Sequence, residues 1–439
     1  MYRRLSHPLS RSAQFTQVPK LLIALTCLSV FAACSLGSVA RAEAPALTEA
    51  RPGPLDSESP ASSPEIEELT ELPEKGARRI ILVIGDGMGA AQLEAASLYH
   101  TGEEEGLVLQ SLPVRAKVAT GSASDKITDS AAAGTALATA VKVQNGVVGL
   151  RFPGDGSDLP SITGDLKEKG WAVGLVTTAF TTHATPAAFG AHVASRLDYA
   201  GISEDYLTGS RPDLIFGGGG YGMDPATVAE AGYAVVRDSD ALVRESRRLA
   251  PEGKIAGLFG EGHLPYIYDG RPGDVPSLVE MAEAAVDFLA RDEQGFFLMI
   301  EAARIDHAGH ANDIHRLIPE VLELDAVVEM LLEHPHLQEE TLLVVTADHE
   351  TGGLAVTGAT GQGVIPEVTW STNGHTAAEV PLFATGAGAD ALAEVVDNTL
   401  LRGAMIASLE PPAGGGRLAD ADAVAPTTGS SGERAPSPP

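Results

Sequence analysis

Continuous apolar runs recur along the chain from residue 79 onward. The first covers residues 79–84 and ends in the turn Gly85-Asp86-Gly87-Met88-Gly89. Others lie at residues 173–177, 214–216, 296–300, 342–345 and 382–384. Runs without polar alternation are typical of strands that are buried on both faces. We therefore expect these segments to form a largely parallel sheet.

Between these runs, apolar residues recur at helical spacing. A helix is expected over residues 90–99. Leu278, Ala282, Ala285 and Leu289 would line one face of a second helix, and Ile314, Leu317, Ile318, Val321 and Leu322 one face of a third. Strands that alternate with amphipathic helices predict an α/β fold, a three-layer αβα sandwich around a mainly parallel central sheet.

The two ends of the chain differ from the middle. Residues 1–42 combine a basic start, an apolar run at 21–33 and Ala40-Arg41-Ala42, which fits the cleavage site of a signal peptide. Residues 43–76 predict a disordered acidic linker, residues 77–409 the folded domain, and residues 410–439 a disordered tail. An apolar run this short does not predict a stable membrane span. We expect an exported protein, periplasmic or extracellular, and lipid attachment at Cys34 is the alternative.

The net charge of the chain limits the classes of molecule that it is expected to bind. The formal net charge is −29, and removal of the leader would leave 25 basic and 59 acidic residues, a net charge of −34. A surface of this charge repels nucleic acid. An anionic substrate would need strong local positive charge, which bound metal ions could supply. Both cysteines, Cys27 and Cys34, lie in the leader, so the mature domain is expected to contain no disulfide.

Carboxylates and imidazoles cluster where the predicted strands end. In parallel sheets, ligands bind beyond the carboxyl ends of the strands. Each residue alone has an ordinary explanation, such as turn chemistry for Asp86 or a helical-face pair for Asp306 and His310. Together they form a ligand set suited to zinc and magnesium. The set comprises Asp86, Glu301, Asp306, His307, His310, Asp348, His349, Glu350 and His375.

One further stretch, Thr128-Asp129-Ser130-Ala131, leads into an alanine-rich segment that is expected to be helical. A serine in the first turn of a helix lies near free backbone N–H groups and the positive end of the helix dipole, which favours an anion there. The alternative is that Thr128 or Asp129 is simply the N-cap. Taken alone, the stretch does not decide between these interpretations.

Several motifs together resemble those of the alkaline phosphatase family. They span residues 78–385 in the family's order. They are Ile84-Gly85-Asp86-Gly87-Met88-Gly89, Thr128-Asp129-Ser130-Ala131, His183-Ala184-Thr185-Pro186-Ala187, Glu301-Ala302-Ala303-Arg304-Ile305-Asp306, Thr346-Ala347-Asp348-His349 and Gly374-His375-Thr376. The resemblance implies that residues 77–409 are a catalytic domain that hydrolyses small phosphate monoesters through a phosphoserine on Ser130.

The resemblance also implies two zinc ions and one magnesium ion. Asp306, His310 and His375 are similar to the ligands of one zinc. Asp86, Asp348 and His349 are similar to those of the other, which Ser130 also approaches. Asp86, Thr185 and Glu301 are similar to the magnesium site. His183 stands beside them, either as a ligand or by holding a water in the magnesium shell.

Two more residues are expected to bind the phosphoryl group. Arg196 is similar to the family's phosphate-gripping arginine, whose planar fork can bind two oxygens. His307 is expected near the phosphate, where its protonation would strengthen product binding as the pH falls. One branch of the family has Asp and Lys where His183 and His307 stand, and another branch has His at both positions. This chain follows the second pattern.

Two alternatives remain open from the sequence. The first is a phosphodiesterase of the same superfamily, because the contacts to a second ester oxygen cannot be read from these motifs. The second is an exported protein that binds phosphate or metal without turnover. A homodimer is also left open, since members of the family are often dimers.

Overall fold

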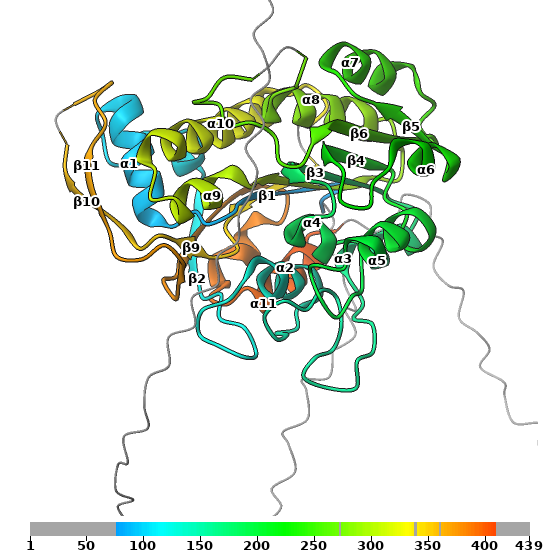
Figure 1. The fold of residues 1–439 in the computed structure, drawn as a ribbon, viewed down its shortest axis with the longest axis horizontal. Coiled ribbons are helices and arrows are strands. Elements are labelled where there is room, and N and C mark those ends of the chain that lie inside the picture. The colour runs from blue at the N-terminus through cyan, green and yellow to red at the C-terminus, as the bar shows by residue number, and fades with distance from the viewer. Residues whose placement is uncertain (1–75, 272–273, 338–339, 360, 410–439) are drawn as a thin grey trace, which may run out of the picture. The chain divides into compact units, whose positions relative to one another are not determined.

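The computed structural model describes residues 76–271, 274–337, 340–359 and 361–409. These residues form a nine-stranded sheet (Figure 1) in which every pair of neighbours is parallel except for β13, which runs antiparallel to both β2 and β8. Across the sheet the strands are β2 (Val114–Val118), β13 (Val380–Gly386), β8 (Thr341–Thr346), β1 (Arg79–Gly85), β7 (Phe296–Ala302), β3 (Ala172–Phe180), β4 (Leu214–Gly219), β6 (Lys254–Glu261) and β5 (Tyr233–Val236).

Helices cover both faces of this sheet (Figure 1). On one face lie α7 (Ser239–Arg248), α8 (Leu278–Leu289) and α10 (Ile314–Glu333), and on the other α2 (Ser130–Thr139), α3 (Ile162–Glu168) and α11 (Thr399–Ala407). The expected αβα sandwich is confirmed. The remaining helices are α1 (Ala90–Thr101), α4 (Ala184–Ala188), α5 (Tyr199–Glu204), α6 (Pro225–Glu230) and α9 (Arg304–His310).

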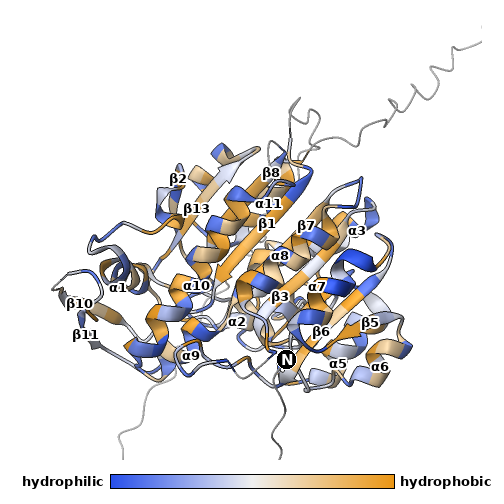
Figure 2. Cartoon of the chain, turned by 90° about the horizontal axis from the view of Figure 1, so that it is seen from above, coloured by the Kyte–Doolittle hydropathy of each residue, from blue (hydrophilic) through white to orange (hydrophobic). Residues whose placement is uncertain are grey.

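The central strands are buried because they are apolar along their whole length. All residues of β3, β7 and β8 are buried, and so are all residues of β1 after Arg79. Figure 2 shows the hydrophobic colour concentrated on strands such as β1 and β13. Each expected strand is present, extended by between one and four residues. The expected helix over residues 90–99 is also present as α1, which continues to Thr101.

The sequence patterns did not predict three strands of the sheet. β2 reads Val-Arg-Ala-Lys-Val and lies at the sheet edge, so its pattern alternates and it lacks a continuous apolar run. β6 contains two glycines, and β5 has only four residues. Short, glycine-containing or edge strands carry a weak local signal because partner strands, rather than their own side chains, stabilise them.

The strand register determines which residues meet at the carboxyl edge. Ile84 of β1 pairs with Glu301 of β7 on one side and with Thr346 of β8 on the other. The residues that follow each strand therefore lie next to one another. Beyond this edge, β9 (Glu350–Thr351) pairs antiparallel with β12 (His375–Thr376), and β10 (Leu354–Gly358) pairs with β11 (Glu367–Trp370).

The expected signal peptide, its cleavage site, Cys27, Cys34, the acidic linker and the tail lie outside the described residues. Among the residues that the structure describes, no helix is both long enough and apolar enough to cross a membrane.

Candidate metal centre and active site

The strand-end residues form three groups at the carboxyl edge of the sheet. In each group, potential ligand atoms from all three residues lie within 4.8 Å of one another. The groups are Asp306 with His310 and His375, Asp86 with Asp348 and His349, and Asp86 with His183 and Glu301. The structure thus brings together residues that are up to 289 positions apart in the sequence, between Asp86 and His375.

The first group has two imidazole nitrogens that face each other. His310 Nδ1 lies 2.6 Å from the Asn373 carbonyl oxygen, and His375 Nδ1 lies 2.8 Å from that of Thr128. A carbonyl only accepts, so both Nδ1 atoms carry the proton and both Nε2 atoms carry a lone pair in the neutral rings. These two Nε2 atoms are 3.1 Å apart, and they lie 3.3 and 3.6 Å from the Asp306 carboxylate. Such a convergence of lone pairs and negative charge is stabilised by a cation.

The second group is completely buried. His349 Nε2 lies 3.2 Å from Asp348 Oδ2 and 3.7 Å from Asp86 Oδ1. Ser130 Oγ lies 3.3 Å from the same nitrogen. The rings of His349 and His375 are stacked with centroids 3.6 Å apart, so the first and second groups are direct neighbours.

The third group lies between β7 and the segment after β3. Glu301 Oε2 accepts a hydrogen bond of 2.5 Å from the Thr177 hydroxyl. Thr185, in α4, is fully buried. His183 Nε2 lies 3.4 Å from an Arg196 guanidinium nitrogen, which can only donate. The His183 Nδ1–H that remains could reach a cation only through an intervening ligand.

Four carboxylate oxygens in these groups are buried and accept no hydrogen bond within the described part of the chain: both of Asp86, Oε1 of Glu301 and Oδ2 of Asp348. Burial raises the pKa of Glu301 to about 7 and that of Asp348 to about 6. Burial, together with Asp348, raises the pKa of Asp86 well above its ordinary value. Buried carboxylates are costly unless they are paired or coordinate a metal, so the donor set fits divalent cations.

Ser130 begins α2, directly after its N-cap. The Asp129 carboxylate accepts hydrogen bonds from the backbone N–H groups of Ala132 (3.0 Å) and Gly146 (3.1 Å). Arg196 Nη1 donates to the same carboxylate at 3.0 Å. Asp129 is therefore the N-cap, as the ordinary interpretation of this stretch held, and it also orients Arg196. One carboxylate thus caps the helix that begins at Ser130 and holds the Arg196 guanidinium.

His307 lies beside this site in a setting that the sequence did not reveal. Arg304 Nη1 is 2.8 Å from His307 Nδ1, and the Arg304 guanidinium lies 3.7 Å from the centre of the Tyr266 ring. Burial, His263 and Arg304 lower the pKa of His307 far below its ordinary value. These surroundings disfavour the expected gain of a proton by His307 as the pH falls. Because Arg304 donates to Nδ1, the neutral ring carries its hydrogen on Nε2.

A second set of polar residues supports the ligands. Sequence reasoning named Glu350 only as a strand-end carboxylate and missed its partners Gln92 and Thr376. Glu350 accepts hydrogen bonds from Gln92 Nε2 at 2.6 Å and from the Thr376 hydroxyl at 2.5 Å. Gln92 also donates to the Thr351 carbonyl at 2.8 Å. The position of Glu350, directly after His349, was the one available signal. This set joins the start of α1 to the two-stranded ladder that carries His375.

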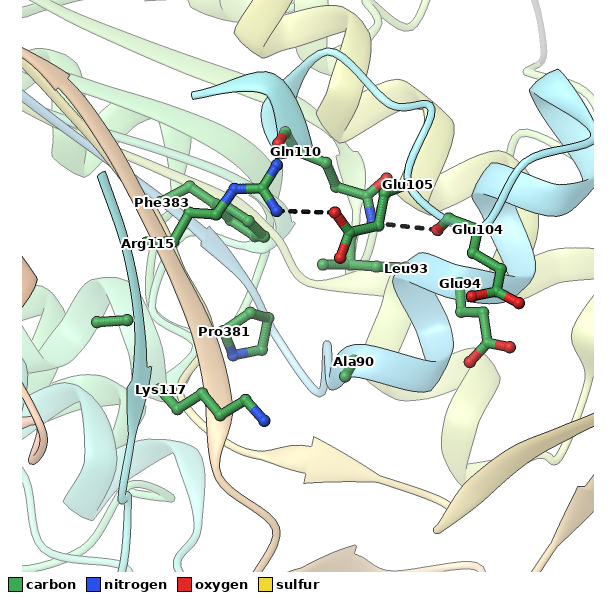
Figure 3. Close-up of a pocket in the computed structure, with 11 residues that line it drawn as sticks. Ala90, Leu93, Glu94, Glu104, Glu105, Gln110, Arg115, Lys117, Pro381 and Phe383 are labelled. Atoms are coloured by element: carbon green, nitrogen blue, oxygen red, sulfur yellow. Dashed lines mark hydrogen bonds and ion pairs between the residues drawn. The ribbon is translucent and has the colours of Figure 1, made fainter. Parts of the chain in front are cut away.

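A separate cavity of about 420 Å³ lies at the β2 edge of the sheet (Figure 3). Figure 3 shows Arg115 reaching toward Glu105, with Phe383 and Pro381 beneath. Its lining contains none of the eight residues in the three groups. It is therefore no rival to the strand-end site. The lining residues are Ala90, Leu93, Glu94, Glu104, Glu105, Gln110, Arg115, Ala116, Lys117, Pro381 and Phe383.

The chain is similar to known proteins in both sequence and fold. A sequence model of the family described as alkaline phosphatase matches residues 77–367. Alkaline phosphatase 3 of Bacillus subtilis is 34% identical over 295 residues, which cover 64% of this chain and 62% of that protein. The chain thus spans about three fifths of that relative's length.

Two further relatives extend the comparison. The streptomycin-6-phosphate phosphatase of Streptomyces griseus is 32% identical over 429 residues, covering 80% of this chain and 94% of that protein. The crystal structure of a cold-active alkaline phosphatase from Shewanella sp. superposes with a TM-score of 0.68 at 29% identity, covering 76% of this chain and all of that one.

Proposed function

This chain belongs to the alkaline phosphatase family, and from that premise we propose that it hydrolyses phosphate monoesters through a phosphoserine formed on Ser130. The observation that carries the proposal is the convergence of unprotonated nitrogens and unpaired carboxylate oxygens beside one hydroxyl. His310 Nε2 and His375 Nε2 are 3.1 Å apart, and Ser130 Oγ lies 3.3 Å from His349 Nε2. A site built in this way is suited to holding cations next to a nucleophile.

Three divalent metals would be held by this chain. Asp306, His310 and His375 would hold one zinc and Asp86, Asp348 and His349 another, because imidazole and carboxylate ligands suit zinc. Asp86, Thr185 and Glu301 would hold magnesium, which prefers oxygen ligands, with His183 in its outer shell. When bound, these metals supply the positive charge that lowers the pKa of a serine hydroxyl and stabilises charge on a phosphoryl group.

The chain's own groups arrange the reaction. Ser130 is 98% buried at the start of a ten-residue helix, where the helix dipole favours a phosphoryl anion. Arg196, held by Asp129 and by His183, presents its guanidinium to two phosphoryl oxygens. The neutral His307 ring would donate a hydrogen bond from Nε2 to the phosphoryl group. Ser130 Oγ gives its proton to water and bonds to phosphorus as the bond to the alcohol oxygen breaks, and the departing alkoxide takes up a proton from water. A water molecule then attacks phosphorus and breaks the bond to Ser130 Oγ, which releases inorganic phosphate and restores the serine hydroxyl.

The test combines metal content with substrate choice. Purified protein is stripped with a chelator and then reloaded with zinc and magnesium, and hydrolysis of an aryl phosphate monoester is compared with that of its diester. We expect the stripped protein to be inactive, the reloaded protein to be active, and the monoester to be the faster substrate. Full activity in metal-free protein would refute the proposal, and faster diester cleavage would identify a diesterase.

A matched pair of variants distinguishes the loss of a carboxylate in the metal centre from the loss of a carboxylate on the surface. Asp306→Asn removes a buried carboxylate of the first group, whereas Asp269→Asn removes an exposed carboxylate that pairs with Arg316. Only the first should lose zinc and activity together. Binding of phosphate at one equivalent without turnover, in reloaded wild-type protein, would favour a binding protein.

We also propose that the protein is exported, because residues 1–42 have the composition of a signal peptide. The mature chain should begin at or near Glu43 and contain no cysteine. Amino-terminal sequencing of the protein from the producing cells tests this proposal. Lipid on Cys34 in a membrane fraction would show the alternative route.

A further inference from the structure

One buried hydroxyl contacts both candidate zinc groups. Thr351, in β9, is fully buried, and its Oγ1 lies 2.5 Å from Asp306 Oδ1 and 3.3 Å from His349 Nδ1. Asp306 belongs to the first group and His349 to the second. Thr351 itself belongs to neither group.

The direction of these two hydrogen bonds follows from the chemistry of the partners. An ionised carboxylate can only accept, so the single hydroxyl proton of Thr351 points to Asp306. The Thr351 oxygen then accepts from His349 Nδ1–H. This leaves the lone pair of His349 on Nε2, the atom that faces Ser130, Asp86 and Asp348. One hydroxyl thereby orients the carboxylate of one group and selects the imidazole tautomer of the other.

The surrounding chain makes room for this hydroxyl and holds it. A side chain at Gly87, where φ is +76°, would come within 2.9 Å of Thr351 Oγ1 and 2.8 Å of the Asp306 backbone. A side chain at Gly309 would come within 3.0 Å of the Thr351 methyl group. Glycine at both positions therefore allows the close approach.

The backbone of Thr351 is held equally firmly. Its N–H donates to the Gly87 carbonyl at 3.1 Å, and its carbonyl accepts from Gln92 at 2.8 Å. In the ladder between β9 and β12, Thr351 pairs directly with His375, the third residue of the first group. Thr351 is thus placed against both groups by contacts that do not involve a metal.

We propose that Thr351 is a positioning residue that couples the two zinc groups, so that filling one group favours filling the other. The inference rests on the proposed function, because Asp306 and His349 act as ligands only if zinc binds there. With zinc in the first group, the Asp306 carboxylate would be fixed in position. The fixed carboxylate would orient the Thr351 hydroxyl, and the hydroxyl would orient the His349 ring. The second zinc then meets an oriented ligand, and by linkage the effect is reciprocal.

The principal test is a zinc titration of metal-free protein, with magnesium in excess, followed by native mass spectrometry. Wild-type protein should pass from no zinc to two zinc ions with little one-zinc species. Thr351→Val keeps the shape but removes the hydroxyl, and it should weaken zinc binding about 10- to 100-fold and accumulate the one-zinc species. Thr351→Ser should restore the wild-type behaviour.

Thr346→Val is the matched control. Thr346 is also buried and close to the same ligands in sequence, but its hydroxyl bonds the Pro381 carbonyl at 3.0 Å instead of a ligand. It should load zinc as the wild type does. If Thr351→Val also loads two zinc ions without the one-zinc species and with unchanged affinity, the inference is overturned while the proposed function stands. Wild-type protein that binds no zinc overturns both.

A spectroscopic measurement tests the tautomer separately. In metal-free protein labelled with ¹⁵N-histidine, His349 should show its proton on Nδ1, and Thr351→Val should shift the ring toward the other tautomer. A wild-type His349 with its proton on Nε2 would contradict the inference. Melting temperatures of the variants show whether each is folded.

Discussion

Glu301→Gln should have opposite effects on stability with and without metal. Glu301 is fully buried at the end of β7, and Oε1 accepts no hydrogen bond within the described residues. Burial raises the pKa of its carboxyl from an ordinary 4.5 to about 7, against the lowering effect of the Thr177 hydroxyl. In metal-free protein, ionised Glu301 therefore opposes folding, whereas a neutral amide of the same shape does not.

The magnitude follows from the difference between the two states. The rise from 4.5 to about 7 corresponds to roughly 3 kcal/mol, since one pKa unit is about 1.4 kcal/mol. The unfolded chain releases this proton near pH 4.5, and the folded metal-free protein keeps it until about pH 7. Stability therefore falls as the pH rises through this window, and the full loss is present above it.

The assay is thermal unfolding of wild type and Glu301→Gln at pH 4.5 and pH 8, each stripped of metal and each loaded with zinc and magnesium. Without metal at pH 8, the variant should be more stable by about 3 kcal/mol, a few degrees in Tm, and the difference should vanish at pH 4.5. With metal the order should reverse, because the amide lacks the ligand's charge. Glu230→Gln, at an exposed position, should leave the stability unchanged both with and without metal. A metal-free variant less stable than wild type at pH 8, or a difference that does not depend on pH, would refute the reasoning.

Three further substitutions address the chemistry. Ser130→Ala should abolish the phosphoenzyme trapped in acid and lower kcat on the order of 10³-fold or more, and phosphate mapped to another residue of the wild type would contradict this. Arg196→Lys should lower kcat/KM about 30-fold, because one charged hydrogen bond of about 2 kcal/mol is lost. A higher KM with unchanged kcat would show that Arg196 binds the substrate and the transition state equally. His183→Asp, which places a carboxylate beside Asp86, should bind magnesium on the order of tenfold more tightly, measured as bound magnesium and as the response to added magnesium. An unchanged magnesium affinity would place His183 away from the third group.

Much of the architecture was readable from the sequence because its causes are local. The runs that became β1, β7 and β8 are apolar along their whole length, and only a strand covered on both faces buries such a run. Parallel strands bring their carboxyl ends to one edge, so Asp86, Glu301 and Asp348 could be expected to meet there. The family motifs added the grouping of the ligands. The structure brings ligand atoms within 4.8 Å of one another in both expected zinc groups, and in the third group it does so for Asp86, His183 and Glu301.

Only the tertiary structure decided how the ligands are held. The tautomer of His375 depends on the Thr128 carbonyl, 247 residues away, and the neutrality of His307 depends on burial and on the Arg304 guanidinium. Thr351 reaches Asp306 across 45 residues because Gly87 and Gly309 leave space for it. Apolar periodicity reports which face of an element is buried. A hydrogen-bond partner is chosen by the packing of distant segments, and the sequence of one segment carries no local signal of it.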